Sequence, residues 1–326
     1  MFTLIEVSSC QNASKPMTTD SNSNPLLCDP KQGVCEVPVT ADAGAASAPE
    51  ATEKPVKIVY FTDPICSACW GIEPQLRRMK MEYGQAIEIE YCMGGLLPRW
   101  EGFNGGGISK PADVYHHWEE VSQYYGMPMV GDVWLNDPLP SSYPPSIAFK
   151  AAQMQDHDKA ILFLRRLREM VFIEAKNITR PELIADAAAW AGLDVKQLEA
   201  DSKGAAVQLF EQDLLKARQW GVRGFPTVFF TDAQGNRLTI YGVRGYEEFE
   251  GNIKRLHPTA LAKELSGDAL VYFNPFKSLT SKELSVFTKT TEEQSRNVLE
   301  NLEKQGKITA IKTKNGSLWR LNPSAK

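Results

Sequence analysis

Two cysteines separated by two residues, Cys66-Ser-Ala-Cys69, follow a short apolar run and open an expected helix. The preceding run, Lys57 to Thr62, is β-branched and aromatic, which predicts a buried strand. Asp63-Pro64 ends that strand, because proline cannot donate to a strand ladder. A close cysteine pair at such a junction has three interpretations: half of a zinc site, a redox pair, or two unrelated core residues.

A structural zinc site needs about four ligands, usually two cysteine pairs or one pair with histidines. A second pair with this spacing is absent from the sequence. The adjacent histidines, His116 and His117, would point in different directions on a helix and so would not converge on one ion. We therefore expect neither a metal nor a cofactor.

The redox interpretation fits the position of the pair better. A cysteine at a helix N-terminus has its thiolate stabilised by the helix dipole and by free N–H groups. The residue three positions later lies on the same face, within reach of a disulfide. The first thiolate attacks and the second resolves the mixed disulfide. We expect Cys66 to be an exposed catalytic nucleophile and Cys69 its more buried catalytic partner.

The chain divides by composition. Residues 1–55 are rich in Ser, Thr, Asn, Ala and Pro, which predicts a disordered tail and linker. Cys28 and Cys35 lie in this tail; they form either a small redox or metal-binding hairpin or an exposed pair without function.

Residues 56–262 are predicted to form one compact unit. Its order is strand, cysteine-pair helix, a second strand at Ile87–Met93, a helical block over about 111–220, a Gly-Phe-Pro-Thr turn, a hairpin and a last helix. Within the block, Thr179 is the predicted N-cap of a helix with Pro181 in its first turn. The fold class is therefore α/β with an α-helical insertion.

This pattern resembles the thioredoxin superfamily, in its DsbA-like branch and close to the FrnE-like subgroup. Pro74, five residues after Cys69, matches the proline that kinks the active-site helix of that superfamily. Phe225-Pro226-Thr227 matches its cis-proline loop, where the residue before the proline pairs with an incoming peptide. The resemblance implies a thioredoxin-like fold around the cysteine pair.

The resemblance also implies roles for individual residues. Substrate would be bound by Phe225, Pro226, Thr227 and Trp70. Three residues are candidates for tuning the pair: Asp63, which otherwise caps the helix, Glu73, which otherwise faces solvent, and Pro74.

Two functions are compatible with this resemblance. The first is a thiol–disulfide oxidoreductase that acts on protein or small-thiol substrates. The alternative is an SpxH-type adapter, a class that delivers a transcription regulator to the ClpXP protease and that need not use its cysteines.

Residues 268–322 are predicted to form a small winged-helix-like domain of two helices and a hairpin turning at Asn315-Gly316. Its second helix carries four glutamates, which weakens attraction to phosphates. The hairpin is more basic, with Lys312, Lys314 and Arg320. Protein docking or a structural cap is favoured over DNA binding.

The sequence has no run of 18 or more apolar residues, so we expect no membrane-spanning helix. The stretch Val7-Ser-Ser-Cys10 resembles a lipoprotein cleavage box, but the residues before it lack Lys and Arg and include Glu6. We therefore expect a cytoplasmic protein.

Overall fold

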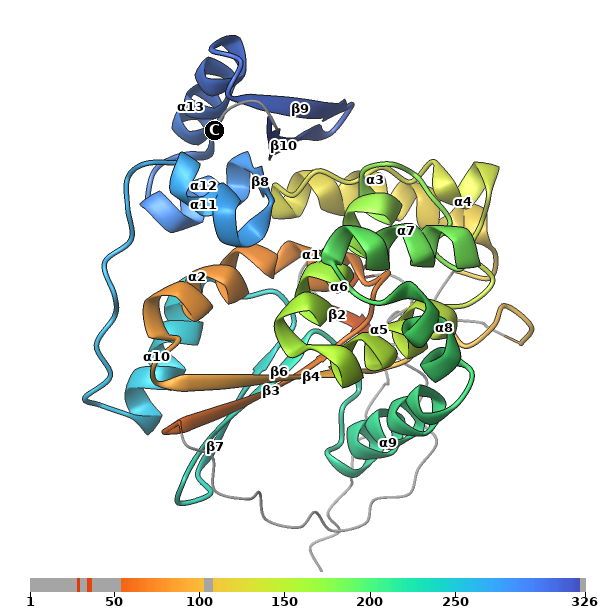
Figure 1. Cartoon of the computed structure of the whole chain (residues 1–326). Coiled ribbons are helices and arrows are strands. Elements are labelled where there is room, and N and C mark those ends of the chain that lie inside the picture. The colour runs from red at the N-terminus through yellow and green to blue at the C-terminus, as the bar shows by residue number, and fades with distance from the viewer. Residues whose placement is uncertain (1–27, 30–33, 37–53, 103–107, 323–326) are drawn as a thin grey trace, which may run out of the picture.

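The structure is a computed structural model that describes residues 28–29, 34–36, 54–102 and 108–322. Its central sheet has four strands in the order β4-β3-β6-β7 (Figure 1). The strands are β3 (Val56–Thr62), β4 (Ile87–Met93), β6 (Thr227–Asp232) and β7 (Arg237–Tyr241). β3 runs parallel to β4 and antiparallel to β6, and β6 runs antiparallel to β7.

The cysteine pair lies at the start of a short helix that follows β3. The sequence predicts one kinked helix here, whereas the structure has two, α1 (Ser67–Gly71) and α2 (Glu73–Tyr83). Pro74 lies in the first turn of α2 and has no N–H to continue the hydrogen bonding of α1. The last helix of the unit, α10 (Tyr246–Leu256), contacts both α2 and β6.

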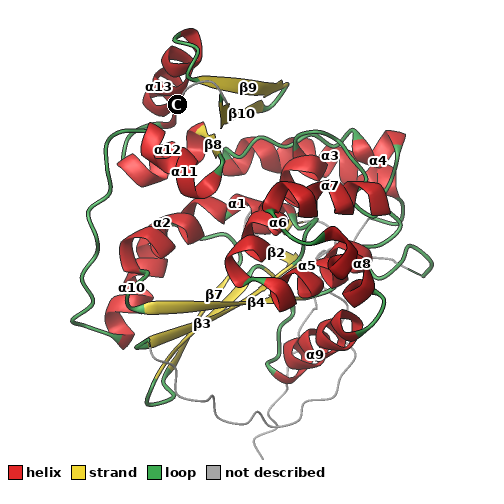
Figure 2. Ribbon diagram, in the orientation of Figure 1, coloured by secondary structure: helices red, strands yellow, loops and turns green. Residues whose placement is uncertain are grey.

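The predicted helical insertion is confirmed. It lies between β4 and β5 and is grouped beside the sheet in Figure 2. Helix α5 is central to it and contacts α6, α8 and α9. The insertion comprises α3 (Pro111–Tyr125), α4 (Val133–Asn136), α5 (Tyr143–Gln155), α6 (His157–Phe172), α7 (Pro181–Ala191), α8 (Val195–Ser202) and α9 (Ala205–Gln219).

A second, small sheet includes part of the predicted tail. Its strands are β1 (Cys28–Asp29), β2 (Val34–Glu36) and β5 (Gly224–Phe225), in the order β1-β2-β5. Cys28 and Cys35 therefore lie on neighbouring strands, as the hairpin alternative expects. Most of the other tail residues, including the box at Val7–Cys10, lie outside the described part of the chain.

The C-terminal segment has its own apolar core, to which Met81 of α2 adds. The sequence predicts a short helix over 279–287 with Thr280 or Ser281 as its N-cap. The structure has Thr280 as the N-cap, in a capping box with Glu283, and strand β8 directly before the helix. The resemblance of the C-terminal segment to a winged helix stays a prediction. The elements are α11 (Leu270–Phe276), β8 (Ser278–Thr280), α12 (Ser281–Thr288), α13 (Glu292–Lys304), β9 (Ile308–Thr313) and β10 (Gly316–Leu321), with the sheet order β8-β10-β9.

Buried ion pairs join this segment to the rest of the chain. Glu283 of α12 is fully buried and pairs with Arg77 of α2 at 2.8 Å and with Arg165 of α6 at 3.0 Å. Arg320 of β10 pairs with the buried Glu169 at 2.6 Å. Figure 1 shows the segment (blue) lying over α1, α2 and the insertion. These contacts fix it against both α2 and α6.

Replacing Glu283 tests how far this junction stabilises the protein. Glu283→Gln keeps the side-chain shape and the helix cap but leaves two buried guanidinium groups without their shared carboxylate. We expect a loss of about 3 kcal/mol in the free energy of unfolding, measured by urea denaturation. The matched control is Glu303→Gln, which breaks a solvent-exposed pair with Lys312 and should cost under about 1 kcal/mol. Equal losses for the two variants would contradict a stabilising role for the buried junction.

Candidate functional site

Cys66 and Cys69 lie at the beginning of α1 and are not joined by a disulfide. Cys66 is the N-cap residue, with φ −76° and ψ 110°, and its Sγ accepts a hydrogen bond from the backbone N–H of Cys69 at 3.2 Å. This is the placement that the sequence predicts, because the strand ends at Thr62 and the chain turns into a helix at Ser67. The two cysteines therefore have the spacing of a redox pair on one helical turn.

Both cysteines are fully buried, with 0% exposure. The expectation of an exposed nucleophile at Cys66 is therefore wrong for this structure. The physical reason is that α1 is enclosed by α2, by α3 and by strand β2. A sequence pattern at a helix start carries no signal for segments that pack over it from elsewhere in the chain.

Buried polar groups surround the second cysteine. Arg168 of α6 donates to the Thr62 hydroxyl at 2.6 Å, and Thr62 donates to the Tyr60 hydroxyl at 2.9 Å. Burial opposes the thiolate of Cys69, but a hydrogen bond from Cys66, the Arg168 charge and the two hydroxyls outweigh it and lower the pKa of Cys69.

The pKa of Cys66 shifts in the opposite direction. Burial raises the pKa of Cys66, and its hydrogen bond to Cys69 and the charge of that thiolate raise it further. Negative charge is therefore favoured on Cys69, and not on Cys66 at the helix start, where the sequence predicts it. This arrangement suits a cysteine that resolves a mixed disulfide.

Glu73 is linked to the surroundings of the pair by Arg168. It is buried and accepts a hydrogen bond from Arg168 at 2.8 Å, and it also pairs with Arg77 at 3.5 Å. Burial raises the pKa of Glu73, but the neighbouring arginines outweigh that effect and hold it below its ordinary value. Glu73 therefore does not face solvent; it orients the cation nearest the cysteines.

Asp63 lies in the loop between β3 and α1 and is also fully buried. Its carboxylate accepts hydrogen bonds from the N–H groups of Ile65 at 3.1 Å and Leu96 at 2.8 Å, and from the Ser142 hydroxyl at 2.8 Å. Burial raises the pKa of Asp63 to about 6, and its charge in turn raises the pKa of Cys66. A carboxyl that titrates near neutral pH beside the pair can exchange a proton during thiol chemistry.

Trp70 points into the protein core. Its ring stacks on Phe172 with centroids 5.6 Å apart, and the Arg165 guanidinium lies 4.3 Å from the ring centroid. Its Nε1 donates to the Pro128 carbonyl at 3.1 Å. These contacts hold α1 against α6 and against the loop at Pro128. The predicted contact of Trp70 with substrate stays a prediction.

The Phe225–Pro226 peptide bond is cis. Thr227 pairs with Phe61 in the register of β6 with β3, so Pro226 lies at the end of the sheet from which α1 departs. The Phe225 ring packs over Gly94, where a Cβ atom would lie 1.8 Å from the ring. The Thr227 hydroxyl donates to the Gly224 carbonyl at 2.7 Å. The loop is thus held rigidly at the cysteine end of the sheet.

Sequence reasoning missed Tyr60, Thr62, Ser142 and Arg168. Every residue of α6 from Phe163 to Phe172 is buried, so the helical period does not single out Arg168 from its neighbours. Tyr60 and Thr62 lie on β3, which is buried on both faces. No alternation of polar and apolar residues therefore distinguishes the side chains near the cysteines from those of the core.

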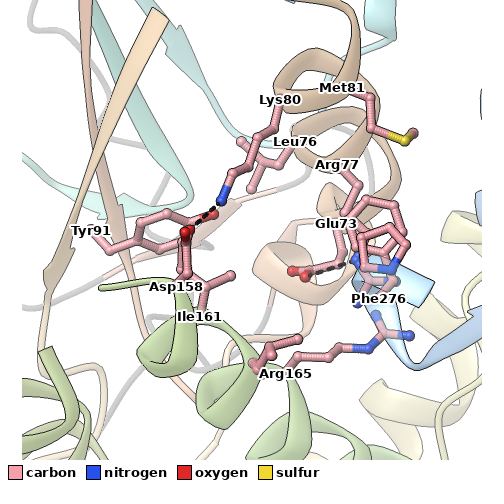
Figure 3. A pocket seen from close by; sticks show the side chains of 12 residues that line it. Glu73, Leu76, Arg77, Lys80, Met81, Tyr91, Asp158, Ile161, Arg165 and Phe276 are labelled. Atoms are coloured by element: carbon pink, nitrogen blue, oxygen red, sulfur yellow. Dashed lines mark hydrogen bonds and ion pairs between the residues drawn. The ribbon is translucent and has the colours of Figure 1, made fainter. Parts of the chain in front are cut away.

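A separate pocket of about 340 Å³ lies between α2, α6 and the C-terminal segment. Figure 3 shows Glu73, Arg77 and Arg165 on one side of it, and the Lys80–Asp158 ion pair on the other. The cysteines do not line it, so it belongs to the junction and not to the redox pair. Within the described ranges, no helix is both long and apolar enough to span a membrane.

Comparison with known proteins supports the fold. Residues 60–251 match the family described as thioredoxin. The chain therefore belongs to the thioredoxin family, and its resemblance to the DsbA-like branch is confirmed. The solved structure of the cytosolic disulfide reductase DsbM from Pseudomonas aeruginosa shares the fold, with a TM-score of 0.51 and 22% identity over 62% of this chain and 97% of that one.

Curated relatives extend the similarity beyond the thioredoxin unit. The ClpXP adapter protein SpxH of Halalkalibacterium halodurans is 32% identical over 314 residues, covering 92% of this chain and 98% of that protein. The protein of the same name from Bacillus subtilis is 25% identical over 276 residues, covering 82% of this chain and 90% of its own.

Arg168 offers a test of the electrostatics around the pair. Arg168→Gln removes the buried cation, so we expect the pKa of the Cys69 thiolate to rise, measured by thiolate absorbance or alkylation rate against pH. The control is Arg166→Gln on the same helix, where the guanidinium pairs with Glu174 instead. An unchanged thiolate titration in Arg168→Gln would show that this cation does not stabilise the site.

Proposed function

We propose that this protein is a thiol–disulfide oxidoreductase whose redox centre is Cys66 and Cys69. The observation that carries the proposal is the buried polar environment of Cys69, in which Arg168, Thr62 and Tyr60 favour a thiolate one helical turn from a second thiol. Core packing alone would not require a cation beside a cysteine. The chemistry needs no metal or cofactor.

The exchange would begin with a proton transfer between the two cysteines. Cys66 passes its proton to Cys69 and attacks a sulfur of the substrate disulfide, releasing one substrate thiolate and forming a mixed disulfide. Cys69 then gives that proton to the released substrate thiolate and attacks Sγ of Cys66, which releases the second substrate thiolate. The pair is oxidised by two electrons and the substrate disulfide is reduced; the reverse sequence oxidises a dithiol.

The substrate would be a protein or a small thiol compound. An extended peptide pairs with exposed strand edges through its backbone. The loop at Phe225, Pro226 and Thr227 lies at the cysteine end of the sheet, where β5 is paired with β2, so a peptide would take the place of β2 along β5. We propose that these residues hold the peptide next to Cys66.

Reduction of insulin disulfides by dithiothreitol tests the proposal. Cys66→Ser should lower the catalysed rate by about two orders of magnitude, because no sulfur remains to form the mixed disulfide. The control is Cys92→Ser, which alters a buried cysteine on β4 and should leave the catalysed rate unchanged. Equal rates for wild type and Cys66→Ser would reject the oxidoreductase.

A second candidate function is favoured by the length of the similarity. The H. halodurans relative aligns over 92% of this chain, which exceeds the thioredoxin unit and extends into the C-terminal segment. We propose that the protein alternatively acts as an adapter that brings a regulator to ClpXP in the cytoplasm. The basic residues of the segment's hairpin, Lys312, Lys314 and Arg320, are in ion pairs with glutamates, which weakens attraction to phosphates and favours a protein partner over DNA.

The adapter proposal is tested by retention of purified ClpX on the immobilised full chain. Cys66→Ala/Cys69→Ala should retain as much ClpX as wild type, because docking does not use the thiols. The same double variant should have lost insulin reduction if the redox pair is catalytic. Failure of wild type to retain ClpX would reject a direct adapter contact.

A further inference from the structure

The N-terminal strands carry two more cysteines in a defined register. β1 and β2 are antiparallel, and Cys28 is the direct partner of Cys35. Residues directly opposite each other in an antiparallel pair have Cα atoms about 4.5–5.5 Å apart. A disulfide requires a Cα separation of about 4.4–6.8 Å. The backbone therefore permits a disulfide between these two positions.

The same strand lies along the edge that we assign to substrate. β2 is antiparallel to β5, with Cys35 opposite Phe225 and Glu36 opposite Gly224. Phe225 directly precedes the cis-proline, and β2 also contacts α1, which begins immediately after Cys66 (Figure 1). A segment of the chain itself thus takes the place of an extended peptide and brings a cysteine to the residue before the proline.

We propose that Cys28 and Cys35 form a second redox pair, which exchanges electrons with Cys66–Cys69 within the same chain. The proposal rests on the redox function proposed above. It makes the N-terminal strand an internal substrate of the site, and it requires an external peptide to displace β2 from the β5 edge before it can bind.

The exchange balances as two thiol–disulfide steps. With Cys66–Cys69 oxidised, the Cys35 thiolate attacks Sγ of Cys66, forms a Cys35–Cys66 disulfide and releases the Cys69 thiolate. The Cys28 thiolate then attacks Sγ of Cys35, forms the Cys28–Cys35 disulfide and releases the Cys66 thiolate. Two electrons move from the N-terminal pair to the helix pair, and two protons move to the newly formed thiolates.

Trapping the intermediate tests the proposal in the full chain. The variant Cys28→Ser/Cys69→Ser keeps the two sulfurs of the intermediate and lacks both resolving cysteines. After treatment with oxidised glutathione in the presence of a chelator, we expect a Cys35–Cys66 disulfide, identified as a linked peptide by mass spectrometry without reduction. The control Cys35→Ser/Cys69→Ser should form a Cys28–Cys66 link at least about tenfold less, because only Cys35 is aligned with the cis-proline.

A second pair of variants tests the strand pairing. Glu36→Pro removes a backbone N–H next to Cys35 in β2, whereas Glu36→Ala keeps it. In the trapping background, the proline variant should lower the yield of the Cys35–Cys66 link and the alanine variant should not. Equal yields in both, or a Cys10–Cys66 link as abundant as the Cys35–Cys66 link, would overturn the proposal.

A further measurement starts from wild type, in which no substitution can disturb folding. In wild type, oxidised glutathione should yield a Cys28–Cys35 linked peptide, and its formation should slow by about tenfold or more in Cys66→Ser/Cys69→Ser. An equal rate would reject the internal exchange. If Cys28→Ser/Cys35→Ser still reduces insulin while no Cys35–Cys66 link forms, only the second pair is rejected. If wild type also fails to reduce insulin, the proposed redox function of Cys66 and Cys69 is itself rejected.

Discussion

Two arginines one turn apart on α6 are buried in the interior, and the arrangement of the molecule depends on how they are paired. Arg165 shares Glu283 with Arg77, and Arg168 is held by Glu73. An unpaired guanidinium in an apolar interior costs several kcal/mol, so the carboxylates have to meet the arginines for the chain to fold. Because these carboxylates come from α2 and α12, the network joins the thioredoxin unit, its insertion and the C-terminal segment at one place.

The same network reaches the cysteines. Arg168 connects the Glu73 carboxylate to the Thr62 hydroxyl and lowers the pKa of Cys69. The thiolate therefore depends on a helix that is inserted between two strands of the fold. The site is also enclosed, since β2 covers the edge beside Phe225 where a peptide would add. Reactivity in this protein is consequently tied to how the N-terminal strand and the insertion pack against α1.

Local chemistry made much of this fold predictable. The cysteine pair at a helix start, the interruption of regular helix near Pro74 and the Thr280 cap depend on residues within a few positions of one another. Other predictions failed because a nearby partner competed. Thr179 is not an N-cap, since its hydroxyl donates to the Asn177 side chain and α7 begins after Arg180. The roles of Arg168 and Tyr60 required contacts across about a hundred residues of sequence, which no local pattern encodes.

The sequence by itself determined the redox-type pair, the α/β order with a helical insertion, and the position of the Phe225–Pro226 loop, because spacing, propensity and proline chemistry act locally. Only the tertiary structure decided that Cys66 is enclosed and that charge is favoured on Cys69. Burial and electrostatic pairing depend on which distant segments come together, and these are set by the packing of α6 and β2 around α1.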